Sequence, residues 1–171
     1  EIKSTPEALP YYTKPENVEL LSRYGVLTAR ECEARKDILL EQYAKVINIE
    51  AYTMYKMTAK MILPACVEFM NVLSESVAKK KDLNMSYDYE GSVLYKASKL
   101  VDEAYAKNNK LEELRRTAAG MTDIEKQTMY LHDVVLAEMD DLRNVIDSLE
   151  LVCSSDYWPL PSYGDMLFYA D

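Results

Sequence analysis

The side chains best suited to metal chemistry are few and widely spaced. His132 is the only histidine of the 171 residues, and the three cysteines are Cys32, Cys66 and Cys153. A zinc site needs ligands at short spacings, and a di-iron bundle needs two Glu-x-x-His elements on facing helices. Neither pattern occurs, since Met129 stands three residues before His132. We therefore expect no metal site and a helix-surface position for His132.

Carboxylates provide no clear acid–base pair either. The adjacent pairs Glu112-Glu113 and Asp140-Asp141 would point in different directions on a helix, which is typical of solvated faces. Glu50 and Glu138 interrupt apolar stripes, and we expect them to be snorkelling or paired residues of a helix seam rather than catalysts. The four glycines are scattered, so no phosphate-binding loop is expected. No catalytic, cofactor-binding or metal-binding residue is predicted.

Charge and apolar content limit the partners. Lys and Arg number 20 against 29 Asp and Glu, and the net charge of −9 argues against nucleic acid or an anionic membrane as a partner. No apolar run approaches the ~18 residues of a membrane span, because the longest candidate stops at Glu68. An odd number of distant cysteines predicts free thiols in the cytoplasm. The missing initiator Met indicates a piece of a longer protein.

Sparse turn residues predict an all-α fold. Only four glycines and six prolines occur, and Pro64 is the only proline between Glu16 and Trp158. A β-rich chain would need turn residues far more often. Pro15 and Gly25 bound a short helix, and Thr28-x-x-Glu and Thr122-x-x-Glu read as capping boxes. We expect long helices at about 28–78, 87–119 and 122–153.

Apolar residues at alternating steps of three and four predict that these helices pack as an up-down-up bundle. The clearest seam runs through the third helix and consists of Ile124, Thr128, Leu131, Val135, Glu138, Leu142, Val145, Leu149 and Val152. We expect the first helix to bend at Pro64 and to project beyond its partners at its N-terminal half. The expected organisation is one domain with an N-terminal segment (1–27), the bundle (28–153) and an aromatic tail (154–171).

Large apolar residues in the tail predict a docking contact. They cannot all face water, and the first helix is expected to leave an uncovered face nearby. The docking and assembly candidates are Leu40, Tyr43 and Ile47 on the helix and Trp158, Tyr163 and Phe168 in the tail.

Four blocks in register resemble the type III glutamine synthetases. They are NVELLSRYGVLT (17–28), YAKVINIEA (43–51), MILPA (61–65) and YWPLPSYGDMLF (157–168). The resemblance covers essentially the whole chain and corresponds to the C-terminal helical region of those enzymes.

The resemblance implies a parent enzyme that makes glutamine from glutamate, ammonia and ATP with Mg or Mn. It also implies two kinds of partner, namely the upstream synthetase barrel of the same chain and neighbouring subunits of a homo-oligomer. The family's active-site motifs belong to that barrel, so none can be placed on this chain, and the isolated chain is expected to be inactive. Two alternatives remain: a stand-alone helical adaptor or oligomerisation module, and an enzyme in its own right, which the lack of converging catalytic groups disfavours.

Overall fold

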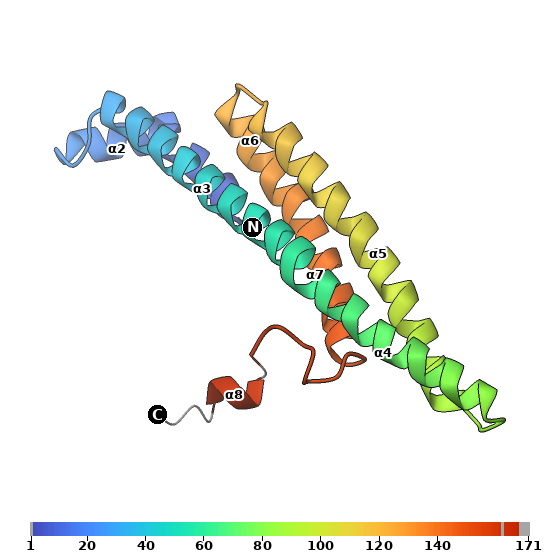
Figure 1. Ribbon diagram of the computed structural model, residues 1–171. Helices are drawn as coiled ribbons and strands as arrows, with labels where there is room; N and C mark the ends of the chain where they lie inside the picture. Colours follow the sequence, from blue (N-terminus) through green and yellow to red (C-terminus); the bar gives the residue numbers. More distant parts are fainter. Residues whose placement is uncertain (1, 162, 168–171) are drawn as a thin grey trace. The chain divides into compact units, whose positions relative to one another are not determined.

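A computed structural model describes residues 2–161 and 163–167, and every regular element in this part of the chain is helical (Figure 1). The all-α prediction is therefore confirmed. The elements, in chain order, are α1 (Thr5–Ala8), the 3₁₀ helix η1 (Leu9–Thr13), α2 (Pro15–Arg23), α3 (Ala29–Met57), the π-helical turn η2 (Thr58–Ile62), α4 (Leu63–Asp82), α5 (Asp88–Ala119), α6 (Ile124–Tyr130), the π-helical turn η3 (Leu131–Val135), α7 (Leu136–Glu150) and α8 (Tyr163–Leu167).

The chain divides into two compact units, neither of which is continuous in sequence. Unit 1 comprises Glu1–Thr53 and Leu111–Ala137, and unit 2 comprises Met54–Lys110 and Glu138–Asp171. In unit 1 the Lys36 ammonium on α3 lies 2.7 Å from the Glu125 carboxylate on α6. In unit 2 the Lys107 ammonium on α5 lies 3.3 Å from the Asp141 carboxylate on α7. Each unit thus joins segments that are far apart in the sequence.

One of the two predicted capping boxes is confirmed. The Thr28 N–H donates to Glu31 Oε2 at 2.7 Å, and the Glu31 N–H donates to Thr28 Oγ1 at 3.3 Å, so two free donors at the start of α3 are satisfied. The second box is wrong by one residue. Asp123 is the N-cap of α6, and its carboxylate accepts from the N–H groups of Glu125 and Lys126. An Asp at this position caps as well as a Thr and brings a charge that favours a helix start.

The ends of α2 and α4 use left-handed residues. Gly25 has φ +66°, and the Val26 N–H donates to the Leu21 carbonyl at 2.9 Å, which is the bond expected where a left-handed residue closes a helix. Asn84 has φ 53° and ends α4 in the same way. The three lysines 79–81 occupy the last turn of α4, where positive charge stabilises the helix dipole.

A π-helical turn precedes Pro64, a feature that the sequence analysis did not predict. In η2 the Leu63 N–H donates to the Thr58 carbonyl five residues earlier, and Pro64 follows in the first turn of α4. A proline has no N–H and crowds the carbonyl four residues before it, so a wider turn gives the ring room without ending the helix. The helix therefore continues from Ala29 to Asp82.

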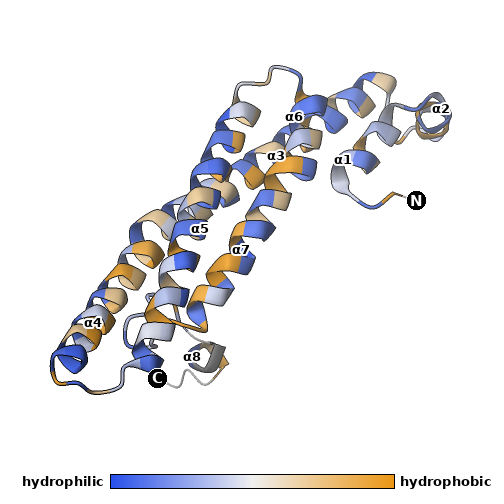
Figure 2. Ribbon diagram, turned by 90° about the vertical axis from the view of Figure 1, so that its right-hand side faces the viewer, coloured by the Kyte–Doolittle hydropathy of each residue, from blue (hydrophilic) through white to orange (hydrophobic). Residues whose placement is uncertain are grey.

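Buried residues follow the predicted seam closely in α6, η3 and α7. Of the nine seam residues, the two terminal ones, Ile124 and Val152, are half-buried and the other seven are buried. Polar and apolar residues alternate along α5 and α7 accordingly (Figure 2). In α3 and η2 the buried residues from Ala51 onward are Ala51, Thr58 and Ile62, whereas Met57 is half-buried and Met61 is exposed.

Three short helices near the ends were also missed. They are α1, η1 and α8, and none exceeds five residues. Helices of this length carry too few periodic positions to be recognised from apolar spacing. The predicted short helix from Pro15 is confirmed as α2.

One helical stretch is long and apolar enough to cross a membrane by length and composition. It lies within Ala29–Asp82, where an 18-residue window has a mean hydropathy of 1.3 and 11% of its residues are buried. The expectation that no segment approaches this length was therefore too strict. The core helices of soluble proteins share this composition, so the match is weak evidence of a membrane span.

Replacing Pro64 with Ala tests whether the π-helical turn depends on the proline. Pro64 is exposed, and removing the turn would rotate the rest of α4 by about 100°, taking Cys66 and Leu73 out of the core. We therefore expect Pro64→Ala to keep the fold and to change the free energy of unfolding by less than about 1 kcal/mol. Urea denaturation measures this, and Ile62→Ala, at a buried position, should cost about 2–5 kcal/mol as a control. A loss of several kcal/mol in Pro64→Ala would show that packing requires the proline.

Candidate functional site

The three docking candidates on the first helix are mostly covered. Leu40 is 1% exposed and Ile47 is 8% exposed, while Tyr43 is half-buried. Leu40 and Ile47 are therefore covered within the described residues, and docking of the tail on this face stays a prediction.

The beginning of the tail contacts α4 within unit 2. The rings of Tyr157 and Phe69 lie 5.7 Å apart between centroids, and the N–H groups of Tyr157 and Trp158 both donate to the Ser154 carbonyl at 3.0 Å. Trp158 is half-buried. Tyr163 begins α8, but its side chain and the whole of Phe168 lie outside the described residues. Docking of these two residues stays a prediction.

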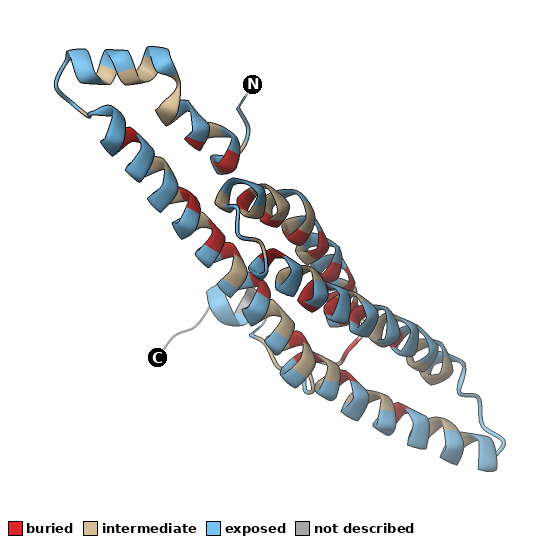
Figure 3. Cartoon of the chain, turned by 90° about the horizontal axis from the view of Figure 1, so that it is seen from above, coloured by how far each residue is buried: buried red, intermediate tan, exposed pale blue. Residues whose placement is uncertain are grey.

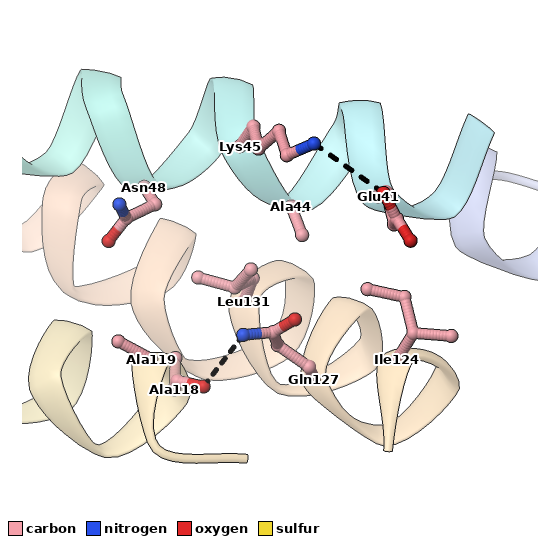
Figure 4. A pocket seen from close by; sticks show the side chains of 9 residues that line it. All are labelled: Glu41, Ala44, Lys45, Asn48, Ala118, Ala119, Ile124, Gln127 and Leu131. Atoms are coloured by element: carbon pink, nitrogen blue, oxygen red, sulfur yellow. Dashed lines mark hydrogen bonds and ion pairs between the residues drawn. The ribbon is translucent and has the colours of Figure 1, made fainter. Parts of the chain in front are cut away.

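A shallow groove in unit 1 is lined by α3, the end of α5 and α6 (Figure 4). Its volume is about 260 Å³, and Ala44, Ala118, Ile124 and Leu131 contribute most of its apolar wall. Its polar groups are already paired: Glu41 lies 3.5 Å from Lys45, and the Gln127 amide donates to the Ala118 carbonyl at 2.9 Å. The groove therefore offers packing surface rather than a nucleophile or base.

Glu112 is buried, in contrast to the solvated position expected for it. Arg115 donates to both of its carboxylate oxygens, at 2.7 and 3.0 Å, and Arg116 donates to one at 2.7 Å. Arg115 also donates to Asn48 at 2.9 Å and lies 4.9 Å from the centre of the Tyr52 ring. These hydrogen bonds, those of Arg115 first, hold the pKa of the Glu112 carboxyl below its ordinary value. The sequence carried one signal for this cluster. Arg115 and Arg116 follow Glu112 by three and four residues, a spacing that brings side chains together on a helix.

Glu138 is a buried, paired seam residue, as expected. It is 4% exposed, and its Oε2 forms an ion pair with the ammonium of Lys110 on α5. Its Oε1 has no hydrogen-bond partner among the described residues. The carboxylate raises the pKa of Lys110 through a hydrogen bond. Glu50, by contrast, is exposed, so the expectation that it belongs to a seam is wrong; Ala51 is the buried neighbour.

The metal-binding residue types are not grouped as ligands. Among residues 2–161 and 163–167, no three His, Cys, Asp or Glu side chains could hold a metal ion together. His132 is half-buried in η3, and its Nδ1 lies 2.8 Å from Asp133. All three cysteines are free and buried, and the thiols of Cys66 and Cys153 influence each other's pKa, a proximity that their spacing of 87 residues did not suggest.

Apolar side chains remain exposed on one side of α3. Ile38 is 63% exposed, Val46 44% and Ile49 62%, and we refer to these three residues as the outer face of α3. Exposed and buried residues alternate along this helix (Figure 3). Exposed aliphatic groups that recur along one side of a helix offer apolar surface to a partner.

Replacing Glu112 with Gln should weaken the acid dependence of stability. Because the folded-state pKa is lowered, the contribution of Glu112 is present above its ordinary value of 4.5 and is lost as pH falls through the lowered value. The free energy of unfolding should therefore fall less steeply below about pH 5 in Glu112→Gln than in the parent sequence. Urea titrations across this range measure it. The exposed neighbour provides the control, since Glu113→Gln should leave the slope unchanged; equal slopes in all three proteins would contradict the assignment.

Substitutions at Lys110 and Glu138 should have unequal effects. Lys110→Met leaves the buried Glu138 carboxylate without its cation and should lower the free energy of unfolding. Glu138→Met places an apolar side chain in an apolar seam and should be neutral or stabilising. A double-mutant cycle in urea tests this, with Lys110→Met expected to cost little in the Glu138→Met background. If Lys110→Met is harmless by itself, the pair contributes nothing.

Comparison with known proteins gives consistent matches. Residues 1–81 match the family model described as the glutamine synthetase C-terminal domain. The chain is 35% identical to a glutamine synthetase of Butyrivibrio fibrisolvens over 170 residues, and 29% identical to the type-3 glutamine synthetase of Dictyostelium discoideum over 177 residues. Each alignment covers 98% of this chain and 24% of the relative. A glutamine synthetase of Bacteroides fragilis is 24% identical over 169 residues, which is 95% of this chain and 23% of the relative.

The chain thus spans about a quarter of the length of the curated relatives that it matches. The family model accounts for the part from the N-terminal segment through most of α4, and the relatives extend the similarity through α5, α7 and the tail. The chain is therefore similar over its whole length to glutamine synthetases, a type-3 enzyme among them, and its residues 1–81 match the model of the glutamine synthetase C-terminal domain.

Proposed function

We propose that the chain is the C-terminal helical region of a type III glutamine synthetase and that its role there is structural. In the whole protein, ATP-dependent ligation of ammonia to glutamate with Mg or Mn would take place on the upstream barrel. Full-chain similarity to glutamine synthetases supports this assignment. The chemistry-bearing residues described above also support it, because Glu112 and Glu138 are tied to cations on the helices rather than directed at a shared pocket.

The proposed architecture is an up-down-up bundle formed by residues 29–82, 88–119 and 124–150. Contacts across both connections support antiparallel neighbours. Lys80 at the end of α4 pairs with Glu90 at the start of α5, and Gln127 on α6 donates to the Ala118 carbonyl at the end of α5 at 2.9 Å. Short connections between long helices favour this topology.

The observation on which the structural role chiefly depends is the outer face of α3. Two of its three aliphatic side chains, Ile38 and Ile49, are more than 60% exposed although the opposite side of the helix is packed. A binding surface of this kind suits a protein partner. We propose that the partner is the upstream barrel of the same chain or a neighbouring subunit of a homo-oligomer. The net charge of −9 supports a role without nucleic acid or membrane, in the cytoplasm.

A stand-alone helical adaptor would use the same surface. In a synthetase, changing the outer face of α3 should affect assembly and synthetase activity. In an adaptor, the same change should affect only the binding of a separate partner. The full-length protein distinguishes them.

Placing Glu at both Ile38 and Ile49 of the full-length protein should disrupt its assembly. Burying two charges in an apolar contact is costly, so size-exclusion chromatography with light scattering should show smaller species, and glutamine formation should fall. The isolated chain with the same substitutions should unfold within about 0.5 kcal/mol of the parent, because both positions are exposed.

Glu50→Lys is the matched control, since it changes charge at an exposed position of the same helix and should leave assembly unchanged. The isolated chain should show no turnover of glutamate, ammonia and ATP. Unchanged assembly and activity in the Ile38→Glu, Ile49→Glu protein would favour the adaptor, and turnover by the isolated chain would contradict the structural role.

A further inference from the structure

Two buried thiols meet where the end of α7 passes α4 in unit 2. Cys66 on α4 is 1% exposed, Cys153 just beyond α7 is 9% exposed, and each thiol influences the pKa of the other. The ring contact between Phe69 and Tyr157 provides an independent sign of the same proximity. Phe69 is three residues after Cys66 and Tyr157 is four after Cys153, and their centroids lie 5.7 Å apart. The two segments thus run together over more than one pair of residues.

We propose that Cys66 and Cys153 are a disulfide-forming site, at which a low-molecular-weight disulfide converts the thiol pair into a crosslink between α4 and the tail. This inference is independent of the proposed function, because it depends only on contacts inside unit 2. Burial raises the pKa of Cys66 to about 12 and raises the pKa of Cys153 as well, so both groups are thiols at neutral pH. Both cysteines are free in the structure, so the crosslink requires an oxidant.

Oxidised glutathione serves as the oxidant, and the exchange balances as follows. The Cys153 thiol, which is the more exposed of the two, loses its proton and attacks one glutathione sulfur. A mixed disulfide forms and one glutathione thiolate leaves, taking up a proton. Cys66 then loses its proton and attacks the sulfur of Cys153, releasing the second glutathione as a thiol. The protein loses two hydrogen atoms in total, and one oxidised glutathione becomes two reduced molecules.

The crosslink would fasten the start of the tail to α4. It closes a loop between positions 66 and 153, and a covalent link across so long a loop restricts the unfolded chain strongly. The oxidised protein should therefore have a higher thermal midpoint than the reduced protein.

The test treats the native full chain with oxidised glutathione and measures free thiols, intact mass and non-reducing peptide maps. Titratable thiols should fall from the three of the reduced chain to one, the mass should drop by two hydrogen atoms, and the map should link the peptides of Cys66 and Cys153. Cys32→Ala is the matched control, since Cys32 is equally buried but lies in unit 1, and it should still form the crosslink.

Cys66→Ala and Cys153→Ala should form no intramolecular crosslink. The same treatment in guanidinium, where the fold is lost, should give mixed pairings that include Cys32. Three free thiols remaining in the native treated protein, a native crosslink to Cys32, or crosslinks between chains alone would each overturn the proposal. Because the peptide map is made on the unsubstituted protein, it decides the matter even if a variant fails to fold.

Discussion

Mutual burial of narrow apolar stripes is the constraint on which the rest of the structure depends. Isolated helices are marginal in water, and most of their stability in proteins comes from packing one face. Here that face is narrow: Leu131, Val135, Leu142 and Leu149 are at most 1% exposed, whereas the residues next to each of them in the sequence are half-buried or exposed. Alanines at 51, 104 and 118 are buried just as completely, which lets helix backbones approach closely. A seam this narrow uses little of each helix and leaves the outer face of α3 free for a partner.

The two π-helical turns show how such a seam tolerates interruption. In η3 the Leu136 N–H donates to the Leu131 carbonyl, five residues earlier, as in η2 before Pro64. Each turn adds a residue to the helix and changes which side chains face inward. Leu131 and Val135 are both fully buried within η3, so the seam continues through the turn. One irregular turn therefore costs less stability than would be lost if the apolar residues beyond it no longer faced inward.

Features that depend on residues close together in the sequence could be predicted, and features that depend on distant residues could not. Thr28 with Glu31, and Gly25 at the end of α2, act within a few residues, so their residue types were enough. The π-helical turn η2 was not predictable, because nothing in residues 58–62 marks a hydrogen bond to the carbonyl five residues earlier. Burial of Glu112 depends on tertiary packing, and adjacency to Glu113 suggested the opposite. The Cys66–Cys153 contact joins positions that no local pattern relates. The burial of Leu40 and Ile47 could not be predicted either, because it depends on helix lengths and caps define helix ends only to within a few residues.

The charged and nucleophilic side chains of the interior are held in states that suit packing rather than catalysis. A general acid or base works best with a pKa near the operating pH. The guanidinium groups of Arg115 and Arg116 favour the ionised form of Glu112, and burial favours the protonated form of Cys66, so neither pKa lies near neutrality. Glu138 is neutralised by a lysine on a neighbouring helix instead of facing a cavity. Each group holds one helix to another or braces its own, and giving it a catalytic role would remove that contact. This division agrees with the proposal that the chain has a structural role.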